Sequence, residues 1–106
     1  MMLGAARAYT YETLDAVWDE LSDTGTLSTP LRLALGLSRV NAFRSARDVA
    51  QLMVDTAGTQ AIYATSPLDR LLRDAITMNQ HIVAQDRMLE ILGGLALGAE
   101  SPFPFV

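Results

Sequence analysis

The local signals that decide the fold are concentrated in one stretch, Thr56-Ala-Gly-Thr-Gln-Ala-Ile-Tyr-Ala-Thr-Ser-Pro-Leu-Asp-Arg-Leu-Leu-Arg-Asp-Ala-Ile-Thr-Met-Asn-Gln-His81. Gly58 predicts the end of a helix, because glycine enters the left-handed conformation that stops helices without a steric penalty. Ser66 and Pro67 predict the start of the next helix, since serine caps a first turn and proline gives up no needed hydrogen bond there. The stretch therefore predicts two helices joined by a short linker.

Apolar residues recur at helical spacing on both sides of this linker. They predict helices over about residues 4–21, 30–56 and 67–92. Residues 99–106 contain two prolines and predict a flexible or docking tail whose two Phe lie against a surface.

Individual side chains in the first two helices carry further expectations. Thr29 is predicted as the N-cap of the second helix, with Pro30 at its first position. Arg44 and Asp48 stand at i, i+4 and predict an ion pair on a solvated helix face, with phosphate contact by the arginines of this helix as the alternative. Trp18 is expected to pack in the core or in an interface.

The expected fold is an all-α single domain of three long antiparallel helices. At about 1.5 Å per residue, the two longer helices would each span roughly 40 Å. That is long for a compact chain of 106 residues. We therefore expect an incomplete up-down bundle of the four-helix type that oligomerisation to a dimer or tetramer completes.

Composition excludes several classes of protein. The net charge of -4 argues against a nucleic-acid partner. The absence of Cys excludes disulfides and thiolate metal sites and fits a cytoplasmic location. With one His, no metal site is predicted. No apolar run reaches the length of a transmembrane helix, so no membrane partner is expected.

The candidate chemistry lies on the third helix, where Arg73, Thr77 and His81 follow one another at i, i+4 and i+8. Residues at this spacing share one helix face. Arginine can clamp a phosphate or carboxylate, and histidine can donate to a ligand or exchange a proton with it near neutral pH. A solvated polar face, with an Arg70–Asp74 ion pair and a structural His, explains the same spacing.

A third possibility is a small helical binding protein with a cavity between its helices. Met53, Met78 and Met88 would line that cavity. Methionine is more often a filler of hydrophobic cores, which gives these residues a simpler explanation.

Ala57-Gly58-Thr-Gln-Ala-Ile-Tyr, then Ser66-Pro-Leu-Asp-Arg-Leu-Leu-Arg-Asp74, then His81 resembles the C-terminal helical domain of the acyl-CoA dehydrogenase superfamily. Where the dehydrogenases carry the Glu that abstracts the α-proton, this chain has Ile82 preceded by His81. The paired glycines of the dehydrogenases correspond to Gly58-Thr59. Both departures look like the flavin-dependent monooxygenase branch.

The resemblance implies a flavin cofactor, FAD or FMN, in the full-length family. It places His81 near the isoalloxazine as the catalytic candidate, and Gly58 and Thr59 near the flavin's phosphate or adenine part, across a subunit interface. Arg73 is the remaining cofactor-binding candidate, or it braces the bundle together with Asp74.

In this family an N-terminal helical domain and a middle β-domain hold most of the flavin and substrate. This chain has no β-domain, so by resemblance it is a C-terminal bundle that is not active alone, and that contributes to oligomerisation and to closing the flavin site. The alternative is a non-enzymatic helical module that forms homo-oligomers and has no activity of its own.

Overall fold

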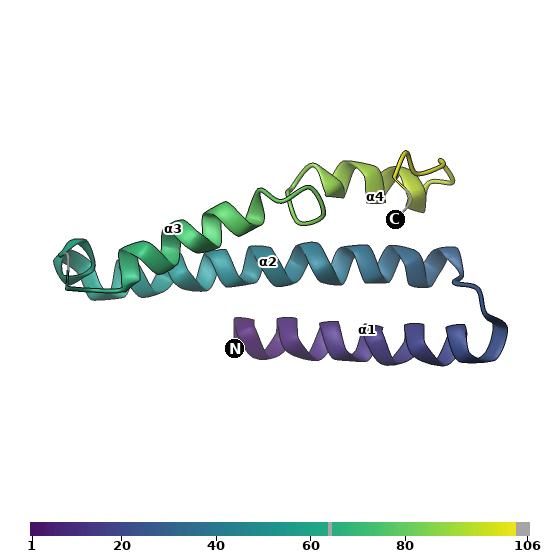
Figure 1. The fold of residues 1–106 in the computed structure, drawn as a ribbon, viewed down its shortest axis with the longest axis horizontal. Coiled ribbons are helices and arrows are strands. Elements are labelled where there is room, and N and C mark those ends of the chain that lie inside the picture. Colours follow the sequence, from purple (N-terminus) through teal and green to yellow (C-terminus); the bar gives the residue numbers. More distant parts are fainter. Residues whose placement is uncertain (64, 104–106) are drawn as a thin grey trace.

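The computed structural model describes residues 1–63 and 65–103, and within them the chain is helical and contains no strand (Figure 1). The all-α class is confirmed. The elements, in order, are α1 (Met2–Thr24), α2 (Thr29–Ala57), a short 3-10 helix η1 (Gly58–Ile62), α3 (Leu68–Asn79) and α4 (Met88–Ala96).

Helix α2 lies between the other helices and contacts all of them. Figure 1 shows α1 along one side of α2, and α3 followed by α4 along the other side. In the described residues α2 packs against each of these helices, whereas the backbone of α1 approaches neither α3 nor α4. The result is an elongated body with a radius of gyration of 16.6 Å, larger than the about 13 Å of a compact chain of this size. Closure of the bundle by further copies stays a prediction.

The predicted third helix over 67–92 is wrong, because residues 80–87 form a turn that separates α3 from α4. The side chain of Asn79 causes the break. Its amide donates 2.9 Å to the carbonyl of Ala84 and accepts 2.6 Å from Arg47 of α2. A side chain that bonds to nearby backbone in this way competes with the helical hydrogen-bond ladder.

A glycine at the end of α1 and hydrogen bonds from Ser28 to Glu20 stabilise the connection between α1 and α2. Gly25, with φ of 73°, ends α1 and donates its N–H to the carbonyl of Leu21. Ser28 precedes α2 and donates from both its N–H and its hydroxyl to the carboxylate of Glu20. The predicted N-cap Thr29 is instead the first residue of α2, and Ser28 takes the N-cap position.

The core lies where α4 crosses α2 and consists of Val40, Met88, Leu92 and Leu95. The helices approach closely at Gly36, where a Cβ atom would stand 2.5 Å from Cδ2 of Leu92. Phe103 of the tail packs against this cluster as predicted, and Phe105 lies outside the described residues.

Two other expectations about apolar residues can be compared with the observed burial. Trp18 is 73% exposed, which rules out the core position and leaves an interface. Met88 is buried in the core, whereas Met53 and Met78 are exposed on the surface. The three methionines therefore do not line one cavity, and the prediction of a small binding protein loses its basis.

Candidate functional site

The turn over residues 80–87 carries His81, and three arginines of α2 hold this turn. Nε of Arg39 donates 2.8 Å to the carbonyl of Val83, and Nη1 of Arg47 donates to Oδ1 of Asn79. Nε of Arg44 lies 3.5 Å from the carboxylate of Asp86. The turn is therefore fixed to α2 at its beginning, middle and end.

These three contacts differ in strength. The Arg44–Asp86 pair is largely solvated, with side chains 42% and 55% exposed, so it contributes at most about 1 kcal/mol. Asn79 is only 1% exposed, and both ends of its amide are satisfied, so its bonds resist exchange with water. Burial lowers the pKa of Arg39 below its ordinary value.

The predicted ion pair between Arg44 and Asp48 is wrong. Arg44 reaches across to Asp86, and Asp48 accepts instead from the neighbouring Arg47 at 3.2 Å. An exposed i, i+4 pair contributes only about 0.3–0.5 kcal/mol, so a partner on another element easily replaces it. The sequence did contain a sign of this network, because Arg47 interrupts an otherwise apolar seam of α2.

His81 is exposed, and its Nδ1 accepts the N–H of Val83 at 3.3 Å. A neutral imidazole that accepts at Nδ1 carries its proton on Nε2. The ring is thus presented to solvent as a hydrogen-bond donor, held by a turn that α2 fixes in place. This is the chemistry expected of a group that donates to an oxygen or nitrogen of a ligand.

The predicted face of Arg73, Thr77 and His81 is not one helix face, because α3 ends at Asn79 and His81 lies in the turn. Arg73 is exposed on α3, and the hydroxyl of Thr77 donates back to the Arg73 carbonyl at 2.8 Å. Arg73 and His81 therefore belong to different elements.

Gly58 and Thr59 open η1, at the other end of α3 from the turn. Helix α3, which lies between the two places, has 12 residues and is about 18 Å long. Gly58 ends α2 as predicted, with φ of 59°, although its ψ of -132° lies outside the left-handed helical region. Both residues are exposed. The structure therefore does not gather the four candidates Gly58, Thr59, Arg73 and His81 into one cavity.

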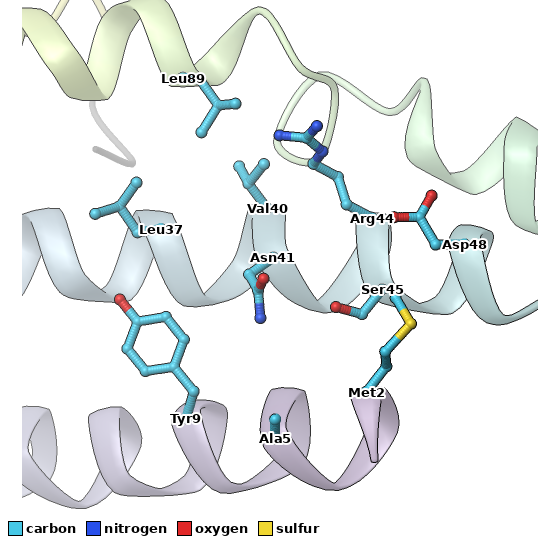
Figure 2. A pocket seen from close by; sticks show the side chains of 10 residues that line it. All are labelled: Met2, Ala5, Tyr9, Leu37, Val40, Asn41, Arg44, Ser45, Asp48 and Leu89. Atoms are coloured by element: carbon cyan, nitrogen blue, oxygen red, sulfur yellow. The ribbon is translucent and has the colours of Figure 1, made fainter.

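A pocket of about 650 Å³ lies between α1, α2 and α4 and contains none of these four residues (Figure 2). Apolar side chains from all three helices form part of it, and a polar row from α2 forms the rest; the residues are Met2, Ala5, Tyr9, Leu37, Val40, Asn41, Arg44, Ser45, Asp48 and Leu89. Arg44 joins this pocket to the turn, because its guanidinium also pairs with Asp86.

Within residues 1–63 and 65–103, no three acidic or imidazole side chains gather as a metal ion would need. No helix in that part of the chain combines the length and the apolar character needed to cross a bilayer.

Comparison with known proteins gives a consistent result. The family model described as "Acyl-CoA dehydrogenase, C-terminal domain" matches residues 1–86. An indole-3-acetate monooxygenase of Pseudomonas putida is 30% identical over 96% of this chain and 26% of its own length. A second indole-3-acetate monooxygenase, from Acinetobacter baumannii, is 30% identical over 89% of this chain and 24% of its own. The chain thus spans about a quarter of the length of these curated relatives.

Proposed function

The chain belongs to the family of acyl-CoA dehydrogenase C-terminal domains, and from this premise we propose that it forms the C-terminal helical part of a flavin-dependent, monooxygenase-type oxidoreductase. The observation that carries the proposal is the similarity to two monooxygenases along nearly the entire chain. Within the whole protein, these helices would support oligomerisation and close one side of the flavin site.

Two exposed places on the described surface could contact a flavin held by the rest of the protein. His81 offers an exposed Nε2–H donor on a turn that is fixed to α2. At Gly58, nothing lies within 4 Å of where a Cβ atom would stand, so a ligand can approach the backbone closely. Because α3 separates the two places, His81 would meet the isoalloxazine, and Gly58 and Thr59 a phosphate or adenine part.

A reduced flavin, when bound, would supply the chemistry of oxygen activation, and the chain's own contribution would be binding and orientation. His81 would donate from Nε2 to the flavin ring or to the substrate and hold that group in position. Arg73 presents an exposed guanidinium that can pair with a phosphate. Arg39, Arg47 and Asn79 act through the turn and are positioning residues for His81.

A chimera tests the proposal. The C-terminal quarter of the Pseudomonas putida monooxygenase is replaced by this chain, and the folded product is assayed for flavin content and oxidation of indole-3-acetate. We expect flavin uptake and measurable oxidation. His81→Ala in the chimera should lower the oxidation rate by roughly 10²-fold or more with flavin retained. The matched control is Gln80→Ala, an exposed neighbour in the same turn, which should leave the rate unchanged.

Three outcomes would contradict the proposal or part of it. A folded chimera that takes up no flavin contradicts the proposal as a whole. A chimera that is active without dependence on His81 contradicts the role of that residue alone. If the chimera does not fold, FAD and FMN are titrated against the chain in the presence of the monooxygenase lacking its C-terminal quarter, and no flavin binding beyond that of the truncated enzyme contradicts the proposal.

The second candidate function is a non-enzymatic module that forms homo-oligomers. It is favoured by large apolar side chains exposed near the η1 end of α2, namely Leu52, Met53, Ile62 and Tyr63. Light scattering with simultaneous visible absorption separates the two functions. A stable colourless oligomer that Leu52→Glu dissociates, together with a chimera that takes up no flavin, would favour this second function.

A further inference from the structure

His81 is held by three consecutive backbone N–H groups of the turn that carries it. The N–H groups of Ala84 and Gln85 donate to the carbonyl of His81 at 2.8 and 2.9 Å. The N–H of Val83 donates to the imidazole Nδ1 at 3.3 Å. We call these three donors the N–H triplet. Together they hold both the backbone of His81 and one nitrogen of its ring.

Side chains of α2 and α3 hold the carbonyls of the same segment. In a trans peptide group the C=O and the N–H point in opposite directions, so a bond to one end orients the other. The carbonyl of Val83 accepts from Nε of Arg39 at 2.8 Å, and the same peptide group carries the N–H of Ala84. The carbonyl of Ala84 accepts from Asn79 at 2.9 Å, and the same peptide group carries the N–H of Gln85. Bonds on the far side of their own peptide groups therefore orient two members of the triplet.

Asn79 is itself held by a charged pair on α2. Nη1 of Arg47 donates to Oδ1 of Asn79 at 2.6 Å. Nε and Nη2 lie along another edge of the same guanidinium, and they donate to Oδ1 of Asp48 at 3.3 and 3.2 Å. Because the guanidinium is planar and rigid, the bonds along one edge fix the direction of the remaining nitrogen. Asp48 thus keeps Nη1 directed at Asn79 and acts on the turn through two other side chains.

The ring of His81 has one nitrogen left for a ligand. Nδ1 accepts the Val83 N–H, so the proton of the neutral ring is on Nε2. The other tautomer, with its proton on Nδ1, would set two N–H groups against each other. The partner of one ring nitrogen decides in this way what the other nitrogen can do. An atom that bonds to Nε2 must therefore be an acceptor, such as a carbonyl oxygen or an unprotonated ring nitrogen.

We propose that the N–H triplet fixes His81 as a hydrogen-bond donor to an acceptor atom of its ligand, and that Asp48 is a further positioning residue, which acts on the triplet through Arg47 and Asn79. Asp48 lies in the polar row of α2 beside Arg44, outside the four predicted site residues (Figure 2). The part that this donor plays in oxidation rests on the proposed function, whereas the fixing of the ring is a property of the chain itself.

Nuclear magnetic resonance of the imidazole nitrogens tests the proposal on the whole chain, because His81 is its only histidine. At a pH where the ring is neutral, we expect a protonated Nε2, an unprotonated Nδ1 and almost none of the second tautomer. Asp48→Ala should move both nitrogen shifts toward those of free neutral histidine. It should also speed hydrogen exchange at the amides of Ala84 and Gln85 by roughly threefold or more. The chain should stay folded, since the lost ion pair is half-exposed.

Two matched variants make the test specific. Asp55→Ala removes the same charge from α2, where this carboxylate accepts from Gln51 at 2.9 Å, and it should leave the ring shifts and the exchange rates at the parent values. Asp48→Asn keeps an acceptor oxygen for Arg47 and should recover part of the change. Equal effects of Asp48→Ala and Asp55→Ala would overturn the role of Asp48.

Tautomers in the proportions of free histidine in the parent chain would overturn the fixed donor. None of these measurements needs a flavin. Their failure is therefore a different result from a chimera that takes up no flavin, which contradicts the proposed function and leaves the orientation of His81 as measured.

Discussion

Nη1 of Arg47 donates a 2.6 Å hydrogen bond to the side-chain oxygen of Asn79, which lies 32 positions later in the chain and is almost fully buried. The nitrogen of the same Asn79 amide donates to the carbonyl of Ala84. One side chain thus connects α2, the end of α3 and the turn that carries His81. Because no other residue type supplies this donor and acceptor pair at that length, Asn79 holds the geometry of the whole turn.

Replacing Asn79 with Ala should therefore destabilise the fold. The substitution leaves the carbonyl of the buried Ala84 without this partner, and such a loss costs about 1–3 kcal/mol. Arg47 also loses a partner but is 27% exposed and keeps its contact with Asp48, so its loss adds less. Urea unfolding measures the change, with the exposed Gln80→Ala as a control that should stay within about 0.5 kcal/mol of the parent. Equal stabilities of the two variants would show that the bonds to Asn79 are not important to the fold.

His81→Ala should leave the free energy of unfolding within about 0.5 kcal/mol of the parent, because the ring is exposed and makes one long bond to Val83. The same denaturant titration provides the measurement. A loss of several kcal/mol would identify His81 as a structural group and remove the basis for a ligand-facing role.

Gly36 and Leu92 should show coupled effects on stability. Gly36→Ala alone forces a Cβ against the buried Leu92 side chain, and overpacking of this kind costs about 1–3 kcal/mol. Leu92→Ala alone opens a cavity and costs about 2–5 kcal/mol. In the Leu92→Ala background the clash is absent, so Gly36→Ala should become stabilising by up to about 1 kcal/mol through helix propensity. A double-mutant cycle in urea checks this, and additive effects would argue against close contact.

Gly58 and Gly93 should respond oppositely to alanine. Gly58 has φ of 59°, a conformation that costs a non-glycine residue about 1–3 kcal/mol, so Gly58→Ala should lower the melting temperature. Gly93 lies inside α4 with open space around it, so Gly93→Ala should raise stability by up to about 1 kcal/mol. Thermal unfolding followed by circular dichroism compares the two, and a destabilised Gly93→Ala would indicate that α4 is not a regular helix there.

Much of the architecture followed from local signals in the sequence. The bounds of α2 differ from the predicted 30–56 by one residue at each end, because proline at its start and glycine at its end act on their own backbone. The family was also recognisable, because the residues from Ala57 to Asp74 and His81 form a linear pattern that needs no tertiary information.

Local sequence signals do not predict that the third helix is divided into α3 and α4. Between Asn79 and Met88 there is no glycine or proline, so periodicity predicts one continuous helix. The residues from Asn79 to Val83 are mostly weak helix formers, which is a hint but not a stop signal. What ends α3 is an Asn79 amide held by Arg47, a contact between distant parts of the chain.

The sequence by itself therefore determined the helical class, the family and the ends of α2, since periodicity, capping and glycine conformation act within a few residues. Only the tertiary structure decided that Trp18 is exposed, that His81 lies in a turn, and that Gly58 and this turn lie at opposite ends of α3. The exposure of Trp18 and the position of His81 depend on which faces of α1 and α3 pack against α2. They also depend on hydrogen bonds between residues more than 30 positions apart. Helical spacing records which residues share a face, but it does not record which face finds a partner.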